Sequence, residues 1–515
     1  MRRWLIVAVA SVLAIGGGLL IWRTVTDPLP GAAAAAQRAA TALTERTITD
    51  GAFGGTAGPA EVADLTATLR GMGTLRPTIT VDDVQLNDDG RRATARLRAD
   101  WVIHAGKPPW VQEAYLSLVR GADGWTAVWS RELIASGLRP GDRVRAVRLA
   151  PVRGEVIGAG DERLVWNQDA KRIGLDKTLV PPQRAGAAAT KLAQAVGIDP
   201  ETFVQRVALN GPRAYVEAAV VRAVGDESWR VLAKARTVEG VRIQDVTRPL
   251  ALSPTFARQV LGSVGEATDQ IIRTSGGSIR QGDLVGLGGL QRAHNTTLMG
   301  VTGFVVQAYP DGHVEQARDL FRVPAVNGGP LRVTLDATRQ RAAEAALAGR
   351  PGRGAVVLIR PSDGAVLALA STPGGTAATS QRVFPKSFPP VTGLPGADPV
   401  QAIEALGLTG DGTVDGLPVF RAGVDGGTVR LSPFAMAAAT ASIVKGATVR
   451  PELVVGSAEP AASGIDIDQA VAVRRALAEP IGERTWAVAV RGDLVVAVYD
   501  SEAKASALLA TMLRA

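Results

Sequence analysis

Alternation of apolar and polar positions predicts two antiparallel hairpins in the first third of the chain. Residues 78–106 alternate on either side of Asp89-Gly90, and residues 112–130 alternate on either side of Asp123-Gly124. Side chains of a strand point to opposite faces with a period of two residues, and an Asp-Gly pair favours a tight turn. The two segments therefore predict a four-stranded meander with one apolar face.

A helix is predicted to cover that apolar face. Residues 31–46 are a run of strong helix formers, and Pro28 and Pro30 mark its start. Four tryptophans of the meander are more typical of a core than of a ligand cage: Trp101, Trp110, Trp125 and Trp129. One helix packed on a curved sheet predicts a cone-shaped α+β domain over residues 27–145.

The last third of the chain predicts a second sheet. Residues 354–371 form two apolar strands around the turn Pro361-Ser-Asp-Gly364, and residues 485–500 form another hairpin. The stretch 372–400 is rich in Pro, Gly, Ser and Thr, which predicts an irregular surface loop. We expect the two hairpins to share one sheet in a domain over residues 331–515.

Helices are predicted to flank this second sheet. One begins after Asp336, whose side chain is placed to cap it, and another runs from the Ser432-Pro433 pair to Gly446. A closing helix is expected after Asp500, with Asp500 or Ser501 as its cap. Between the two sheets, residues 146–330 mix short strands with helices and predict a separate α/β domain.

The first residues predict a membrane anchor. An uncharged run of nineteen residues from Trp4 to Trp22 follows Arg2 and Arg3. Such a helix rises about 28 Å, enough to cross a hydrocarbon layer about 30 Å thick. The arginines favour a cytoplasmic N-terminus, so residues 1–26 are expected to form a cytoplasmic tip and anchor, with the rest outside the cell. The alternative is a signal peptide cleaved before Gly31.

Composition narrows the possible chemistry. The chain of 515 residues has no cysteine, which excludes disulfides and thiolate metal sites, and its three histidines are widely spaced: His104, His294 and His313. The histidines are therefore too few and too widely spaced to indicate a histidine metal site or a Ser-His-Asp triad, and we expect no metal or cofactor. The net charge of +8 comes from scattered arginines, which argues against nucleic acid as a partner.

Several stretches, in the same order along the chain, resemble class B penicillin-binding proteins. Arg153-Gly-Glu-Val156 resembles the Arg-Gly-x-Ile element that opens their pedestal domain. Gly286–Gln291 resembles their Gly-x-x-Gly-Leu-Glu stretch, with Gln291 in place of the usual acid. Residues 334–347 and 354–371 resemble the start of their transpeptidase domain, and residues 431–454 resemble a later helix of it.

The resemblance implies an NTF2-like domain of the MecA type over residues 27–145, a pedestal or dimerisation domain over 146–330 and a transpeptidase-like domain over 331–515. Active members carry Ser-x-x-Lys, Ser-x-Asn and Lys-Thr-Gly, and this sequence has no Ser-x-Asn and no Lys-Thr-Gly. The expected fold class is an α+β multidomain chain with an N-terminal membrane anchor, an NTF2-like cone, a mixed α/β pedestal and a truncated serine-transpeptidase sheet of the β-lactamase type with flanking helices.

Two stretches match Ser-x-x-Lys formally. Ser442 and Lys445 lie in the last turn of their predicted helix, where the helix dipole opposes an oxyanion. Ser501 and Lys504 follow the last strand, where capping explains the serine. We interpret both pairs as structural and expect no catalytic residue. If Ser442 faces solvent, alanine should be tolerated there.

The sequence therefore predicts a catalytically inactive, penicillin-binding-protein-like scaffold or regulator of extracytoplasmic peptidoglycan synthesis in the cell membrane. Its expected partners are the membrane and either cell-wall synthesis proteins or peptidoglycan. One alternative is a divergent, active D,D-transpeptidase that binds penicillin through Ser442 and Lys445. A second alternative is an extracytoplasmic binding module that uses the NTF2-like cone.

An uncleaved anchor predicts that the mature membrane protein begins at Met1 or Arg2. N-terminal sequencing of protein purified from membranes measures this directly. Protease added outside intact cells should also reach most of the chain. A mature sequence that starts near Gly31 would identify a secreted protein instead.

Overall fold

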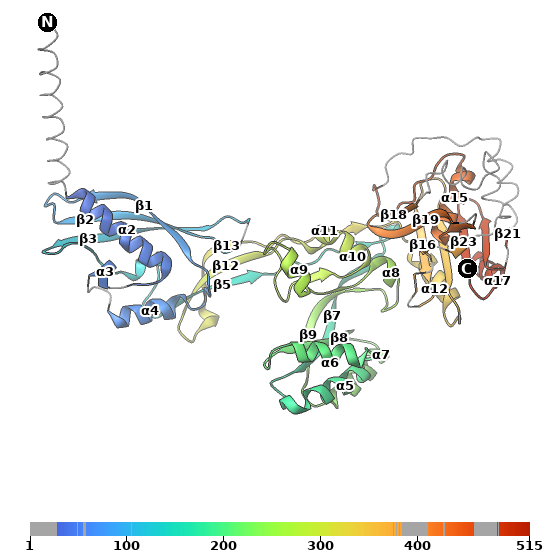
Figure 1. Cartoon of the computed structure of the whole chain (residues 1–515), viewed down its shortest axis with the longest axis horizontal. Coiled ribbons are helices and arrows are strands. Elements are labelled where there is room, and N and C mark those ends of the chain that lie inside the picture. The colour runs from blue at the N-terminus through green and yellow to red at the C-terminus, as the bar shows by residue number, and fades with distance from the viewer. Residues whose placement is uncertain are drawn as a thin grey trace, which may run out of the picture. The chain divides into compact units, whose positions relative to one another are not determined.

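A computed structural model describes residues 28–48, 50–54, 58–104, 106–373, 375–376, 378–380, 382–383, 410–425, 428–457, 481–482 and 484–514. The predicted anchor, residues 1–26, and most of the predicted loop 372–400 lie outside these residues. None of the described helices is long and apolar enough to cross a membrane. The chain forms two compact units (Figure 1). The first contains residues up to 151 together with 268–281 and 301–326, and the second contains the remainder.

Both predicted hairpins of the first unit are confirmed. They form one antiparallel sheet in the order β1-β2-β3-β4, with Trp101 opposite Trp110. The strands are β1 (Pro77–Leu86), β2 (Arg92–Trp101), β3 (Trp110–Gly121) and β4 (Gly124–Ala127). Trp101 and Trp110 are buried, as predicted for core residues.

The predicted helix of this unit is confirmed as α2 (Leu29–Glu45). Its buried side chains are mostly alanines spaced three and four residues apart, which lets the helix lie close to the sheet. The structure adds two helices that the pattern did not predict, α3 (Asp50–Phe53) and α4 (Pro59–Leu69). Together they cover one face of the meander with an apolar core.

The first unit also contains a three-stranded antiparallel sheet in the order β13-β12-β5. Its strands are β5 (Asp142–Leu149), β12 (Gly303–Pro310) and β13 (Arg318–Val323), and a short helix, α9 (Asp269–Thr274), belongs to the same unit. β5 continues past residue 145, where we expected the first domain to end. Its pairing with β12 joins segments about 160 residues apart in the sequence.

The second unit begins with a sheet in the order β14-β6-β7-β8, in which β9 also pairs with β7. The strands are β6 (Val156–Ile157), β7 (Arg163–Asp176), β8 (Tyr215–Arg222), β9 (Val241–Ala251) and β14 (Leu331–Arg332). The helices α5 (Ala185–Val196), α6 (Pro200–Leu209) and α7 (Asp226–Arg236) share an apolar core with β7 and β8. A short helix, α8 (Arg258–Leu261), follows β9.

Short elements complete this part of the second unit. β10 (Val264–Glu266) pairs with β11 (Leu284–Gly286), and α10 (Gly289–Ala293) and α11 (Asn295–Met299) follow. Four 3-10 turns lie elsewhere in the described chain: η1 (Arg131–Leu133), η2 (Ala159–Asp161), η3 (Pro182–Arg184) and η4 (Val314–Gln316).

The two C-terminal hairpins share one sheet, as predicted (Figure 1). The order is β16-β15-β23-β22-β21. The strands are β15 (Gly354–Ile359), β16 (Val366–Ser371), β21 (Ile481–Gly482), β22 (Trp486–Val490) and β23 (Val495–Asp500). The helices α12 (Ala337–Leu347) and α17 (Ala505–Arg514) cover one face, and α15 (Pro433–Lys445) covers the other. Because both faces are buried, the strands are apolar throughout.

A smaller sheet in the order β17-β20-β19-β18 was not predicted. It consists of β17 (Arg382–Val383), β18 (Gly410–Val414), β19 (Leu417–Asp425) and β20 (Thr428–Leu431). Two of the predicted caps are confirmed: Asp336 accepts a hydrogen bond from the Arg339 N–H, and Ser432 accepts one from the Ala435 N–H.

The close approach of two backbone segments at Gly154 predicts that a larger residue there destabilises the second unit. The Gly154 N–H donates to the Leu298 carbonyl at 2.8 Å, and a Cβ at Gly154 would lie 2.0 Å from the Gly329 carbonyl oxygen. Gly154→Ala should therefore lower the free energy of unfolding by about 1–3 kcal/mol, measured as a lower urea midpoint. Gly186→Ala is the matched control, because nothing lies within 4 Å of a Cβ there. Equal midpoints for the two variants would contradict the packing.

Candidate functional site

Ser442 lies in the last turn of α15, as the sequence predicted, and is almost completely buried, with 1% of its surface exposed. Its Oγ donates a hydrogen bond to the Ala438 carbonyl at 2.8 Å and accepts one from the Val449 N–H at 2.9 Å. The condition under which alanine was expected to be tolerated, a solvent-facing Ser442, is not met, because α15 is buried on all sides from Pro433 to Ile443. Ser442 joins the end of the helix to the segment that follows.

Lys445 lies three residues further on, at an exposed position before the left-handed Gly446 that ends α15. A cation there interacts favourably with the last carbonyls of the helix. Lys445 lines a shallow cavity of about 490 Å³ with Ser362 and Asp493, whereas Ser442 is not among its lining residues. The structure therefore does not bring the hydroxyl and the ammonium of the first formal match into one cavity.

The second formal match closes a junction between two strands. The Ser501 Oγ accepts a hydrogen bond from the Arg353 N–H at 2.8 Å, and the Ser501 N–H donates to the Arg353 carbonyl at 2.9 Å. The predicted capping role is wrong, because a turn with Ala503 at a φ of 61° separates Ser501 from α17, which begins at Ala505. The Asp500 carboxylate instead accepts from the Glu502 N–H at 2.8 Å, inside that turn.

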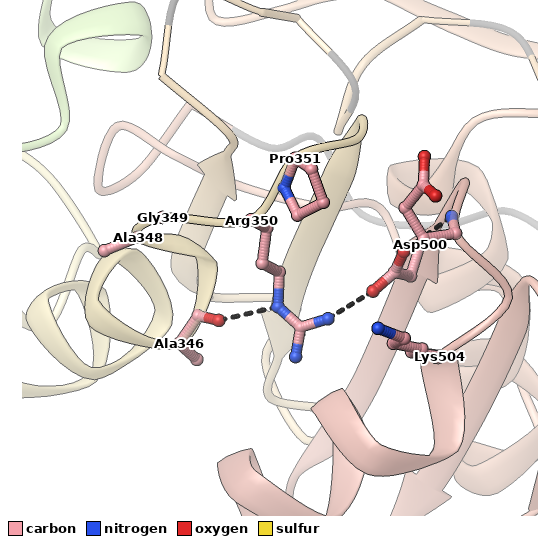
Figure 2. Close-up of a pocket in the computed structure, with 8 residues that line it drawn as sticks. Ala346, Ala348, Gly349, Arg350, Pro351, Asp500 and Lys504 are labelled. Atoms are coloured by element: carbon pink, nitrogen blue, oxygen red, sulfur yellow. Dashed lines mark hydrogen bonds and ion pairs between the residues drawn. The ribbon is translucent and has the colours of Figure 1, made fainter.

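A cavity of about 350 Å³ lies beside this turn, with Arg350, Asp500, Glu502 and Lys504 among its lining residues. In Figure 2, the Arg350 guanidinium extends between the Ala346 carbonyl and the Asp500 carboxylate. Arg350 Nε donates to the Ala346 carbonyl at 2.9 Å, and Arg350 Nη1 forms an ion pair with Asp500. Asp500 is buried and already paired, so this group of charges holds the end of α12 to the end of β23.

A buried arginine joins the two stretches that the sequence singled out in the middle of the chain. Arg153 is 5% exposed, and its Nε donates to Gln291 Oε1 at 2.9 Å. Its Nη1 donates to Asn295 Oδ1 at 3.0 Å, and its Nη2 donates to the Gln291 carbonyl at 3.1 Å. Burial lowers the pKa of Arg153 to about 10. Its three hydrogen-bond acceptors are neutral, and Gln291 Nε2 is buried without a hydrogen-bond partner in the described part of the chain.

The same segment contacts the smaller C-terminal sheet. A His294 ring nitrogen lies 3.0 Å from the Asp415 carbonyl in the β18–β19 turn. The Asp415 carboxylate accepts hydrogen bonds from the backbone N–H groups of Leu453 and Val454, each at 2.8 Å. Gly416 packs so closely that a Cβ there would lie 2.4 Å from the Ala293 Cβ. A continuous set of polar contacts therefore runs from Arg153 into the C-terminal part of the second unit.

The described polar groups are thus arranged to hold elements together. The hydroxyls of Ser442 and Ser501 both form hydrogen bonds with backbone groups. No cluster of three or more His, Asp or Glu side chains that could hold a metal occurs among the described residues. Acyl transfer needs a serine hydroxyl beside a base, and neither Ser442 nor Ser501 has the lysine of its motif as a hydrogen-bond partner in the described part of the chain.

Comparisons with known proteins find similar chains. The penicillin-binding protein dimerisation domain family matches residues 148–333, which include Arg153 and Gln291. The peptidoglycan D,D-transpeptidase MrdA of Acinetobacter baumannii is 36% identical over 137 residues, which are 26% of this chain. The match spans only 20% of the length of that curated relative.

A solved structure shows a related fold. Penicillin-binding protein PBP2 from Helicobacter pylori, in its complex with MreC, matches with a TM-score of 0.50 and 14% sequence identity. The similarity covers 72% of this chain and 98% of the PBP2 chain. The two chains therefore share a multidomain α/β fold.

The burial of Ser442 predicts a structural cost for its loss. Ser442→Ala should lower the free energy of unfolding by about 1–3 kcal/mol, because the buried Val449 N–H loses its acceptor. Ser506→Ala, at an exposed position of α17 in the same unit, should change it by no more than about 0.5 kcal/mol. Urea denaturation of the two variants measures the difference. If the Ser442 variant were as stable as the Ser506 variant, the Ser442 hydroxyl would not stabilise the fold.

Proposed function

This chain is a relative of the class B penicillin-binding proteins, and we propose that it acts in extracytoplasmic peptidoglycan synthesis as a non-catalytic scaffold or regulator. The observation that carries this proposal is the environment of Ser442. Its hydroxyl is buried and donates to a backbone carbonyl, so its proton is not directed at a base. A nucleophile needs that proton to be removed as it attacks.

The sequence supports the same conclusion independently. Neither Ser-x-Asn nor Lys-Thr-Gly occurs in the chain, and the other formal Ser-x-x-Lys match uses Ser501 to bond to Arg353. Ser442 also lies near the C-terminal end of its helix, where the dipole disfavours an anion by about 0.3–1 kcal/mol. For Ser442 to act as the nucleophile of a divergent enzyme, both its hydroxyl and the C-terminal end of α15 would have to change conformation.

The dimerisation domain match covers the middle of the chain, and the PBP2 neighbour was solved in a complex with MreC. We therefore include in the proposal a protein partner from the cell-wall synthesis machinery. We also include an N-terminal anchor over residues 1–26 that keeps the remainder of the chain outside the cell.

A labelled penicillin tests the absence of catalysis. Penicillin acylates an active serine nucleophile and leaves a stable adduct, so labelling reports whether nucleophile, base and oxyanion hole occur together. The purified full chain should remain unlabelled, as judged by intact mass. Stoichiometric labelling that disappears in Ser442→Ala would establish the divergent enzyme instead. Labelling that disappears in Ser501→Ala would assign the nucleophile to the second motif.

A further inference from the structure

A cavity of about 730 Å³ lies in the second unit, away from both formal serine motifs. Its described walls come from four segments: α8, the end of β16, residues 376 and 378–380, and the hairpin of β18 and β19. This volume is within the range of about 300–1,000 Å³ that is typical of ligand pockets. The sequence analysis assigned no role to any of these segments.

The rim of the cavity carries uncharged polar groups. They are the hydroxyls of Ser371, Thr376, Thr379 and Ser380 and the amide of Gln259. Ser371 Oγ accepts from the Ala378 N–H at 2.9 Å, which leaves its own proton available, and the Thr376 and Ser380 hydroxyls are 2.8 Å apart. Hydroxyls and an amide can both donate and accept hydrogen bonds. Because no charged residue is among the described residues that line the cavity, this part of its surface fits an uncharged ligand.

The floor of the cavity is aliphatic. Val260, Leu369, Leu417 and Val419 line it, and each is no more than 6% exposed. None of its lining residues is aromatic. A surface of branched aliphatic side chains under a hydroxyl rim suits small aliphatic side chains attached to a hydrogen-bonding backbone.

Two sheet edges also meet the cavity. β16 is the last strand of the five-stranded sheet, and β18 is the last strand of the smaller sheet. The Leu369 N–H and carbonyl bond to the Gln340 side chain at 2.8 and 3.3 Å. Backbone groups two residues apart in a strand point to the same side, so those of Ser371 are directed toward the same edge. Strand edges are templates for pairing with another extended chain.

We propose that this cavity binds a short, extended and uncharged peptide segment of a partner protein, with small aliphatic side chains on the floor and backbone groups on the hydroxyl rim. The strand edges favour a peptide over a saccharide, since their backbone groups complement another backbone. The proposal extends the scaffold function by naming the chemistry of a partner. It does not depend on that function, because an active enzyme could use the same cavity.

The absence of cysteine from the chain allows a specific test. Thr379→Cys places one thiol on the rim, and Thr511→Cys, at an exposed position of α17, is the matched control. The rate of alkylation by iodoacetamide is measured on the full chain by intact mass. The probe is a mixture of acetylated, amidated tetrapeptides built from Ala, Val, Ser and Thr. We expect saturating peptide to slow alkylation of the Thr379 variant at least fivefold and to leave the Thr511 variant unchanged.

Further variants and probes in the same alkylation experiment distinguish the possible outcomes. Adding Gln259→Ala to the Thr379 variant should raise the peptide concentration needed for half-protection, because an exposed rim amide is lost. Tetrapeptides in which Glu or Lys replaces the aliphatic residues should protect poorly. Absence of protection, equal protection of the Thr511 variant, or protection by chitotriose in place of the peptides would overturn the proposal. The penicillin experiment reports on catalysis alone, so either proposal can fail without the other.

Discussion

A buried guanidinium is the constraint on which the second unit depends. Arg153 donates to three neutral acceptors and is 5% exposed, so each lost acceptor would leave part of a desolvated cation unsatisfied. The residue thereby fixes the segment before β6 against α10 and α11. The next contacts along those helices, from His294 and Ala293, fix the β18–β19 turn. In the family pattern that the sequence resembles, an acid occupies the position of Gln291. In this chain Arg153 instead donates its hydrogen bonds to neutral acceptors.

The same use of polar groups recurs in the C-terminal domain. Ser442 bonds to the Ala438 carbonyl within its own helix and to the Val449 N–H, Ser501 bonds to the Arg353 backbone, and Asp500 pairs with Arg350. Each of these groups could take part in chemistry if it were exposed beside a base or a substrate. Here they stabilise the junctions between strands and helices. The sheet and its covering helices are therefore held together in part by these polar contacts.

The local sequence pattern predicted most of the helices and strands, but few of the distant segments with which they pair. The hairpins around Asp89-Gly90 and Pro361–Gly364 and the caps Asp336 and Ser432 were correct, because turns and caps depend on neighbouring residues. Two contacts join segments that are distant in the sequence: the pairing of β5 with β12 and the hydrogen bonds between Ser501 and Arg353. The periodicity of a segment does not identify the distant segment that it contacts. The burial of Ser442 did have a signal. Residues 433–443 offer no charged side chain, and a helix without a charged face is typically enclosed.

The central claim is that no serine of this chain is an acyl-transfer nucleophile, and pre-steady-state kinetics with a thioester acyl donor test it most directly. An active serine releases one thiol per enzyme in a rapid burst as the acyl-enzyme forms. Since the chain has no cysteine, any thiol that appears comes from the donor. The account predicts thiol release at the rate of the buffer alone, with no burst. A burst equal to the protein concentration would contradict it.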